Sequence, residues 1–187
     1  MKTRFWLLAL LSFIYIPAVH AHDVGQDMAR AASKFLGALS AEEKAKASFP
    51  FKDEERLNWH FVPKERKGFP FKEMNSDQQR LAHALIRSAM SPHGYAKATN
   101  IMNLELVLQE LEGAGRRFTR DPALYFISIF GQPEPKGTWG WRLEGHHLAV
   151  NMTVIEGRLV TGTPTFFGAN PAEVRQGPRK GLRVLAL

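Results

Sequence analysis

The chain has 187 residues, a formal net charge of +7 and no cysteine. The lack of cysteine excludes disulfides, thiol nucleophiles, thiolate metal sites and iron–sulfur clusters. Stability must therefore come from an apolar core, for which the 44% of hydrophobic residues and the length of one ordinary domain suffice.

The first 21 residues have the layout of a secretory signal peptide. Lys2 and Arg4 give it a basic start, the apolar run Phe5–Ile16 follows, and small residues lead up to Ala21. The apolar run is shorter than the roughly 20 residues that a membrane span needs. We therefore predict cleavage after Ala21 and an exported protein, periplasmic or extracellular, in which residues 22–187 form a single domain. The alternative is an uncleaved membrane anchor.

The basic charge predicts an anionic partner. Loss of Lys2 and Arg4 lowers the net charge from +7 to +5, because residues 1–21 contain no acid. Outside the cytoplasm this charge favours an anionic envelope polymer or lipid head groups over DNA. A small-molecule ligand is the alternative partner. Nucleic acid is not expected as a partner, since no nucleic-acid-binding motif accompanies the charge.

Helical patterns dominate the first part of the mature chain. Apolar residues recur at helical spacing through Val24–Leu39, and a capping box at Ser40 begins a second short helix that ends at Ala47. A third helix is predicted from a capping box of Ser76 with Gln79. The fourth begins at Ser91-Pro92, is interrupted at Asn103 and ends before Gly113. Phe49–Asp53 and Glu55–Val62 are predicted to be extended.

Strand patterns dominate the second part. Leu124–Phe130 is predicted to be a buried strand, residues 131–137 a loop, and Trp139–Ile155 one long strand with a bulge near Gly145. Glu156-Gly157 is typical of a hairpin turn that leads into Arg158–Thr163. Pro164–Ala169 is predicted to be irregular and Pro171–Arg175 to form one helical turn. The expected fold class is α+β, with N-terminal helices packed on a mostly antiparallel sheet.

Four segments resemble those of the domain-of-unknown-function 3500 family of exported bacterial proteins. They are WHFVPKERKG (Trp59–Gly68), RDPALYFISIFGQP (Arg120–Pro133), WGWRLEGHHLAVN (Trp139–Asn151) and TPTFFGANPAEV (Thr163–Val174). The resemblance implies secretion and this architecture, but no activity. Members of the family generally continue into a second half, so the resemblance also implies that this chain is truncated and holds the first half only. The apolar end GLRVLAL favours the same interpretation, because it leaves a strand edge unpaired.

The segment Trp139–Thr153 contains more side chains that can bind a metal or transfer a proton than any other part of the sequence. On a regular strand Glu144 and His146 share one face, while His147 and Asn151 share the other. Two imidazoles and a carboxylate are typical ligands of a divalent transition metal such as zinc or iron. Adjacent histidines diverge on a regular strand, so only a bulge at Gly145 would bring Glu144, His146 and His147 together. The alternative is a Glu144–His146 hydrogen bond that fixes the sheet register, with His147 facing solvent.

Two functions remain open at this stage. One is a metal-dependent exported enzyme, with His60 as an accessory ligand or proton carrier, Arg142 as an anion contact and Asn151 beside His147. The other is a non-catalytic envelope or polysaccharide-binding domain, in which Trp139 and Trp141 form an aromatic platform and the histidines only brace the sheet. Aromatic residues at alternate strand positions also fit a buried core.

Overall fold

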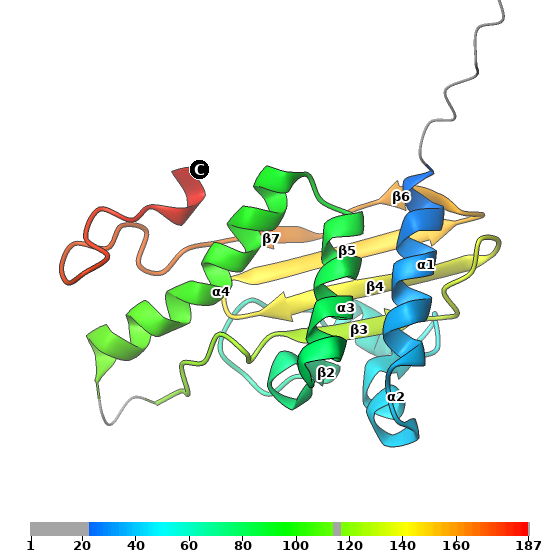
Figure 1. Ribbon diagram of the computed structural model, residues 1–187, viewed down its shortest axis with the longest axis horizontal. Coiled ribbons are helices and arrows are strands. Elements are labelled where there is room, and N and C mark those ends of the chain that lie inside the picture. Colours follow the sequence, from blue (N-terminus) through cyan, green and yellow to red (C-terminus); the bar gives the residue numbers. More distant parts are fainter. Residues whose placement is uncertain (1–22, 114–116, 187) are drawn as a thin grey trace, which may run out of the picture.

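The computed structural model describes residues 23–113 and 117–186. The signal peptide predicted for residues 1–21 therefore lies outside the described residues. Within these two ranges, helices pack on one face of a mixed, mostly antiparallel sheet, which confirms the predicted α+β class (Figure 1). No helix in these ranges is both long enough and apolar enough to cross a membrane.

The first two helices follow the predicted pattern. Helix α1 (Val24–Gly37) is capped by the Asp23 side chain, which accepts a hydrogen bond from the Gly25 N–H. Helix α2 (Ala41–Ala47) begins with the predicted capping box, in which Ser40 and Glu43 exchange side-chain and backbone hydrogen bonds. These caps satisfy amide groups that a helix N-terminus would otherwise leave unpaired.

The next two helices differ in detail from the prediction. Helix α3 (Ser76–Ser88) is capped by Asn75, with Gln78 in the third helical position, so the capping box lies one residue earlier than predicted. Helix α4 (Pro92–Glu112) runs through Asn103 without a break, and the predicted interruption was wrong. The side chains of Met102 and Leu104, on both sides of Asn103, are buried in the core and keep the helix continuous.

The described strands form one seven-stranded sheet with the path β1-β3-β4-β5-β6. Strand β1 pairs in parallel with β3, whereas the pairs β3–β4, β4–β5 and β5–β6 are antiparallel. Two short strands complete it, since β2 pairs with β3 and β7 pairs with β5. The bounds are β1 (Ser48–Phe49), β2 (Phe69–Pro70), β3 (Phe126–Phe130), β4 (Thr138–Gly145), β5 (Leu148–Ile155), β6 (Arg158–Thr161) and β7 (Thr165–Phe167).

The long strand predicted for Trp139–Ile155 is in fact two strands. Strand β4 ends at Gly145 and β5 begins at Leu148, and these two residues are the last pair of the ladder. His146 and His147 form the two-residue turn between them. The turn reverses the chain where the prediction had placed only a bulge. The hairpin predicted at Glu156-Gly157 is confirmed by the pairing of β5 with β6.

The remaining segments also correct the prediction. Glu55–Val62 is not a strand, because Asp53 caps a short 3-10 helix, η1 (Glu54–Leu57), by accepting a hydrogen bond from the Glu55 N–H. A second 3-10 helix, η2 (Phe71–Glu73), follows β2. Pro164–Ala169 contains β7, Pro171–Arg175 forms no helical turn, and the chain's last described element is the 3-10 helix η3 (Val184–Ala186).

The hydrophobic core lies between the sheet and helices α1, α3 and α4 (Figure 1). Alternate residues of β4 point into it, so Trp139 and Trp141 are 0% and 1% exposed. The indole N–H of Trp141 points at the Met28 sulfur of α1, at 3.5 Å. Both tryptophans therefore belong to the core, and the aromatic platform considered from the sequence is not present on the surface.

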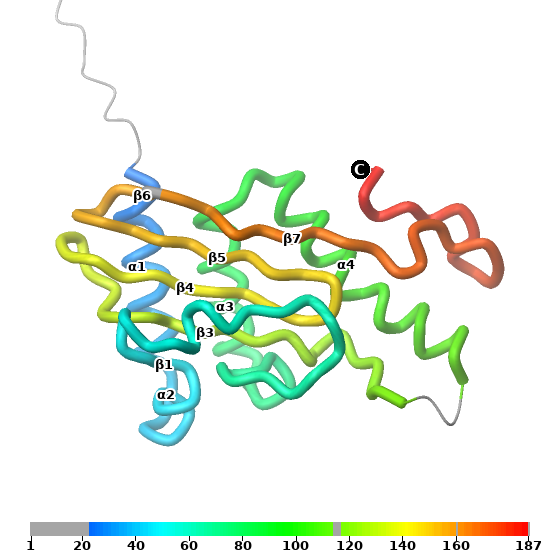
Figure 2. Tube along the Cα trace, turned by 180° about the vertical axis from the view of Figure 1, so that it is seen from behind, coloured from blue at the N-terminus to red at the C-terminus, as the bar shows by residue number. Residues whose placement is uncertain are grey.

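The other face of the sheet is covered by the strap, which we define as residues 50–68 (Figure 2). The strap crosses β3 and β4 and carries η1. Side chains of β4 that alternate with the tryptophans, Arg142 and Glu144, point towards it and are 0% and 1% exposed. Arg142 donates hydrogen bonds to the Glu55 carbonyl and carboxylate, at 2.7 Å and 2.6 Å. Buried ionic contacts therefore hold the strap on the sheet.

We expect Gly145→Ala to destabilise the protein by about 2 kcal/mol, as overpacking in a close-packed core does. A Cβ atom at this position would lie 2.3 Å from Cδ1 of the Tyr125 ring. That ring has little room to move, because Tyr125 is 0% exposed and its hydroxyl is hydrogen-bonded. The free energy of unfolding in urea measures the effect.

Gly37→Ala is the matched control. Gly37 is the last residue of α1, and a Cβ atom there would meet nothing within 4 Å. This variant should be as stable as the parent or slightly more stable, since alanine favours helices. Equal stabilities for Gly145→Ala and the parent would contradict the close approach of Tyr125.

Candidate functional site

The two-residue turn at His146-His147 is held from three directions. The Tyr125 hydroxyl donates to the His146 carbonyl at 2.6 Å. The backbone N–H of His147 donates to the Phe61 carbonyl of the strap, and Gly168 N–H donates to the His147 carbonyl, both at 2.8 Å. His147 has a φ of 58°, a left-handed conformation in which histidine is tolerated better than most residues. The backbone of both histidines is therefore fixed.

His146 pairs with a carboxylate that comes from a helix. Its Nδ1 atom lies 2.5 Å from Oε1 of Glu105, in the middle of α4. The Glu105 side chain is 5% exposed and that of His146 is 11% exposed. Burial of a carboxylate is costly unless the carboxylate is paired. The contact with His146, together with the neighbouring Arg120, explains how Glu105 can lie on the buried face of α4.

Arg120 supports this pair. Its guanidinium makes two hydrogen bonds of 2.8 Å with Glu112, near the end of α4. Its Nη1 atom also lies 3.8 Å from Oε2 of Glu105 and 3.2 Å from Nδ1 of His146. The hydrogen bonds with Glu112 are the main reason that the pKa of Arg120 is raised. Arg120 therefore adds a fixed positive charge beside Glu105.

The distances assign the hydrogen on the His146 ring. Both Glu105 and Arg120 approach Nδ1, but only one can share a hydrogen with it. The contact with Glu105 is shorter, 2.5 Å against 3.2 Å, and it joins an imidazole to a carboxylate. We therefore place the hydrogen on Nδ1, between the ring and Glu105, which leaves the lone pair on Nε2.

The Nε2 atom is the open end of this imidazole ring. It forms no hydrogen bond with a residue in the described ranges, and it is not among the buried polar atoms that lack a partner. It therefore keeps contact with solvent. His146, Glu105 and Arg120 all line a cavity of about 450 Å³ between the hairpin tip, α4, the strap and residues 117–126.

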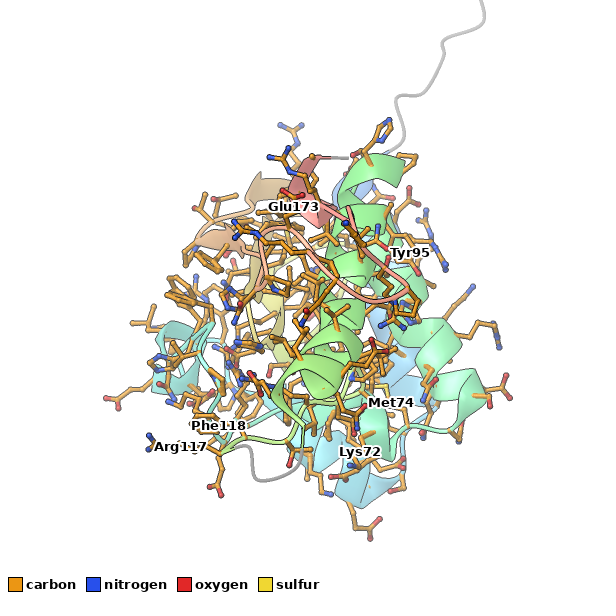
Figure 3. All side chains as sticks on the ribbon, turned by 90° about the vertical axis from the view of Figure 1, so that its left-hand side faces the viewer. Lys72, Met74, Tyr95, Arg117, Phe118 and Glu173 are labelled. Atoms are coloured by element: carbon orange, nitrogen blue, oxygen red, sulfur yellow. The ribbon has the colours of Figure 1, made fainter. Side chains whose placement is uncertain are left out.

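The cavity has a basic rim and an apolar wall. The basic residues that line it are Lys64 and Arg66 of the strap, Arg117 and Arg120. The apolar wall consists of Pro63, Phe118, Leu124, Tyr125 and Phe126. Figure 3 looks onto this end of the molecule and shows Arg117 and Phe118 beside the C-terminal end of α4. Convergent polar groups on an apolar wall are the usual composition of a ligand site.

Glu144 does not join the histidines. Its carboxylate contacts Arg142 at 2.9 Å and Arg66 at 3.7 Å. It also accepts a hydrogen bond of 3.0 Å from the backbone N–H of His60. Burial raises the pKa of Glu144, and Arg142 opposes that shift. The sequence predicted that Glu144 lies beside His146, but Glu144 instead holds the strap on the sheet.

The predicted ligand set of Glu144, His146 and His147 is therefore not assembled. The turn does bring the two imidazoles close, with ring centroids 4.3 Å apart. However, His147 lies against Phe166, and its Nδ1 atom is buried without a hydrogen-bond partner. In the part of the chain that the structure describes, no three histidine, aspartate or glutamate side chains are grouped so that they could hold a metal ion.

The accessory residues have structural partners. The ring of His60 is hydrogen-bonded to Asn58 at 3.0 Å, within the strap. The Asn151 side chain donates to the Pro164 carbonyl at 2.7 Å and so joins β5 to the segment before β7. Arg142 is bound to Glu55 and Glu144, and Trp141 is in the core. None of these four lines the cavity beside His146.

Sequence reasoning missed Glu105 and Arg120. A signal for Glu105 was present, because it lies four residues after Ile101 and three before Leu108, on the apolar stripe of α4. An acid in such a stripe must be paired or functional. No comparable signal marks Arg120, which precedes Asp121-Pro122 in an irregular segment.

The fold and site define an α+β domain with a carboxylate-bound histidine at the rim of a basic cavity. The chain matches the family described as Protein of unknown function (DUF3500) over residues 21–187, and it belongs to that family. No curated protein and no solved structure matches it.

We expect the protein to lose stability as the pH falls below neutrality, partly because of His147. Burial is the main reason that the pKa of His147 is lowered from its usual 6.5. As the pH falls through this usual value, His147 takes up a proton in the unfolded chain before it does so in the folded one. The free energy of unfolding therefore decreases. His147→Asn removes the titrating group and keeps a residue that tolerates the left-handed backbone.

Urea unfolding between pH 7.5 and 5.5 measures this effect. The decline in the free energy of unfolding should be smaller for His147→Asn than for the parent. The comparison between variants is needed because Glu144, whose pKa is raised, changes stability in the opposite direction. Identical slopes for the two proteins would contradict the assignment.

Proposed function

We propose that the chain is an exported bacterial domain that transfers protons at the cavity beside the hairpin tip. His146 is the base and Glu105 orients it. The signal-peptide layout of residues 1–21 supports export to the periplasm or the outside of the cell. The observation that carries the chemical part is the 2.5 Å contact between Nδ1 of His146 and the buried Glu105.

The geometry supports a general base because the two ring nitrogens have different roles. Nδ1 donates to Glu105, so the Nε2 lone pair is the one available to accept a proton. When Nε2 accepts a proton, Nδ1 keeps its hydrogen bond with Glu105, so the ring keeps its orientation during the transfer. A carboxylate that holds the tautomer and orientation of a histidine is the recurrent arrangement in acid–base catalysis.

The surroundings keep this pair in place. Tyr125 fixes the carbonyl of His146, and Arg120 fixes Glu105. The described residues that line the cavity include no serine or cysteine, and their hydroxyl groups are those of Thr119 and Tyr125. Tyr125 already donates its hydroxyl hydrogen to the backbone. Tyr125 is therefore not placed to act as a nucleophile.

The base can be tested without knowing the natural substrate. In 5-nitrobenzisoxazole, removal of the carbon-bound proton breaks the N–O bond and releases a coloured cyanophenolate. We expect the protein to accelerate this reaction above buffer, because a positioned general base contributes roughly 10²- to 10⁴-fold. His146→Gln should abolish the acceleration, and Glu105→Gln should reduce it by about tenfold, a part of the whole contribution of the base.

The matched control is His83→Gln. His83 is also half-buried and lines a second cavity, but its Nδ1 atom contacts the Tyr95 hydroxyl at 3.1 Å rather than a carboxylate. This variant should keep the parent's rate. Equal losses in the two histidine variants, or full activity of His146→Gln, would sink the proposal.

A chelator separates this function from a metal-dependent one. A zinc or iron ion at this site would use the same Nε2 atom as a ligand. The assay is therefore run before and after treatment with a strong chelator. An unchanged rate supports the imidazole as the base, whereas loss of the rate and its return with added metal supports the metal-dependent enzyme instead.

A further inference from the structure

Most charges that line the cavity beside His146 are already neutralised. Arg66 is paired with Glu144, and Arg120 with Glu112. Asp121 is bound by Lys72 at 2.9 Å. Glu105 is shared between His146 and Arg120. These pairs leave little net charge from the residues that are more deeply placed.

Two cations at the rim have no such partner. Neither Lys64 nor Arg117 forms an ion pair with an acid in the described ranges, and both are exposed. Arg117 lies over the ring of Phe118, with its guanidinium carbon 5.2 Å from the centroid. Against these two cations the lining provides one further acid, Glu65. The rim therefore carries a net positive charge.

One of these two cations, Lys64, also acts on a neighbouring group. Burial is the main reason that the pKa of His60 is lowered, and the next contribution comes from Lys64. Lys64 therefore adds a positive potential to the space next to the strap. Clefts lined by one sign of charge raise the local concentration of ligands of the opposite sign.

The wall below this rim is apolar. Phe118, Leu124 and Phe126 line it, and the total volume of about 450 Å³ is within the usual range for small-molecule sites. The second cavity, beside His83, offers a useful contrast, because none of the described residues that line it is a lysine or arginine. A ligand with a charged end and an apolar body fits the first cavity and not the second.

We propose that the cavity beside His146 takes a small organic anion, with its negative group at Lys64 and Arg117 and its apolar body against Phe118 and Leu124. The inference rests on the proposed proton transfer, because it places the ligand's body next to Nε2 of His146. The substrate is then an organic carboxylate or phosphate. The two cations bind the anionic group, and the wall directs the rest of the molecule to the base.

Chemical protection of His146 tests this inference. Bromoacetamide is a neutral reagent that alkylates imidazole nitrogens, and the chain has no cysteine to compete for it. The rate of modification at His146 is followed by mass spectrometry of peptides. Benzoate and benzamide serve as protecting ligands, because they have the same shape and differ in charge. We expect benzoate to slow the modification at concentrations at least about tenfold lower than benzamide, the factor expected for one charge-assisted interaction.

Charge-removing variants locate the effect. The double variant Lys64→Gln/Arg117→Gln should lose the protection by benzoate, measured relative to its own unprotected rate of alkylation. Lys44→Gln/Lys180→Gln removes the same charge from two exposed lysines that do not line the cavity, and it should behave as the parent. Equal protection by benzoate and benzamide, or equal loss in both double variants, would overturn the proposed anion site.

The two proposals can fail separately. If His146 is active in ring opening of 5-nitrobenzisoxazole but benzoate gives no protection, the anion site falls and the proton-transfer function remains. If His146 is neither alkylated nor active as a base, the proton-transfer function falls. Calorimetric titration of His146→Gln with benzoate then decides the anion site alone, because that variant keeps Lys64 and Arg117. Heat of binding that the Lys64→Gln/Arg117→Gln substitutions abolish would support it, and no heat would overturn it.

Discussion

The site depends on a turn of only two residues. Because β4 ends at Gly145 and β5 begins at Leu148, the chain reverses at His146-His147 and places both rings at one end of the sheet. Glycine at position 145 lets the Tyr125 ring pass under the turn, where its hydroxyl reaches the His146 carbonyl. A longer loop would leave the imidazole mobile. The short turn fixes it within reach of a helix that lies 41 residues earlier in the chain.

The buried charges behind the sheet serve the same end. Arg142 is completely buried, and its carboxylate partners are Glu55 on the strap and Glu144 on its own strand. Such a network adds little net stability, because desolvation of the ions offsets their attraction, but loss of one partner costs about 3–5 kcal/mol. Its contribution is positional. It fixes the strap, and the strap supplies Lys64 and Arg66 to the cavity.

The sequence predicted the layers of this fold better than its site. Period-two alternation holds within β4, where Trp139 and Trp141 lie on one face and Arg142 and Glu144 on the other. The prediction that Glu144 belongs to the core-facing side was wrong, because the tryptophans face the core and Glu144 faces the strap. The same alternation failed beyond Gly145, because it assumes a continuous strand and a turn of two histidines carries no glycine, asparagine or aspartate to announce it. The prediction therefore gave His146 the neighbouring acid, Glu144, whereas tertiary packing provides Glu105.

Two carboxylates near one end of the sheet thus have opposite partners. Glu144 lies between Arg66 and Arg142, and its ion pairs with them hold the strap on the sheet. Glu105 contacts the His146 imidazole and shares Arg120 with Glu112, so it is placed to orient the ring. The two carboxylates differ in their partners because Glu144 belongs to the sheet and Glu105 belongs to α4. Proton transfer at His146 therefore requires the helix layer to be docked on the sheet, and any change that loosens this packing should weaken the base before it unfolds the domain.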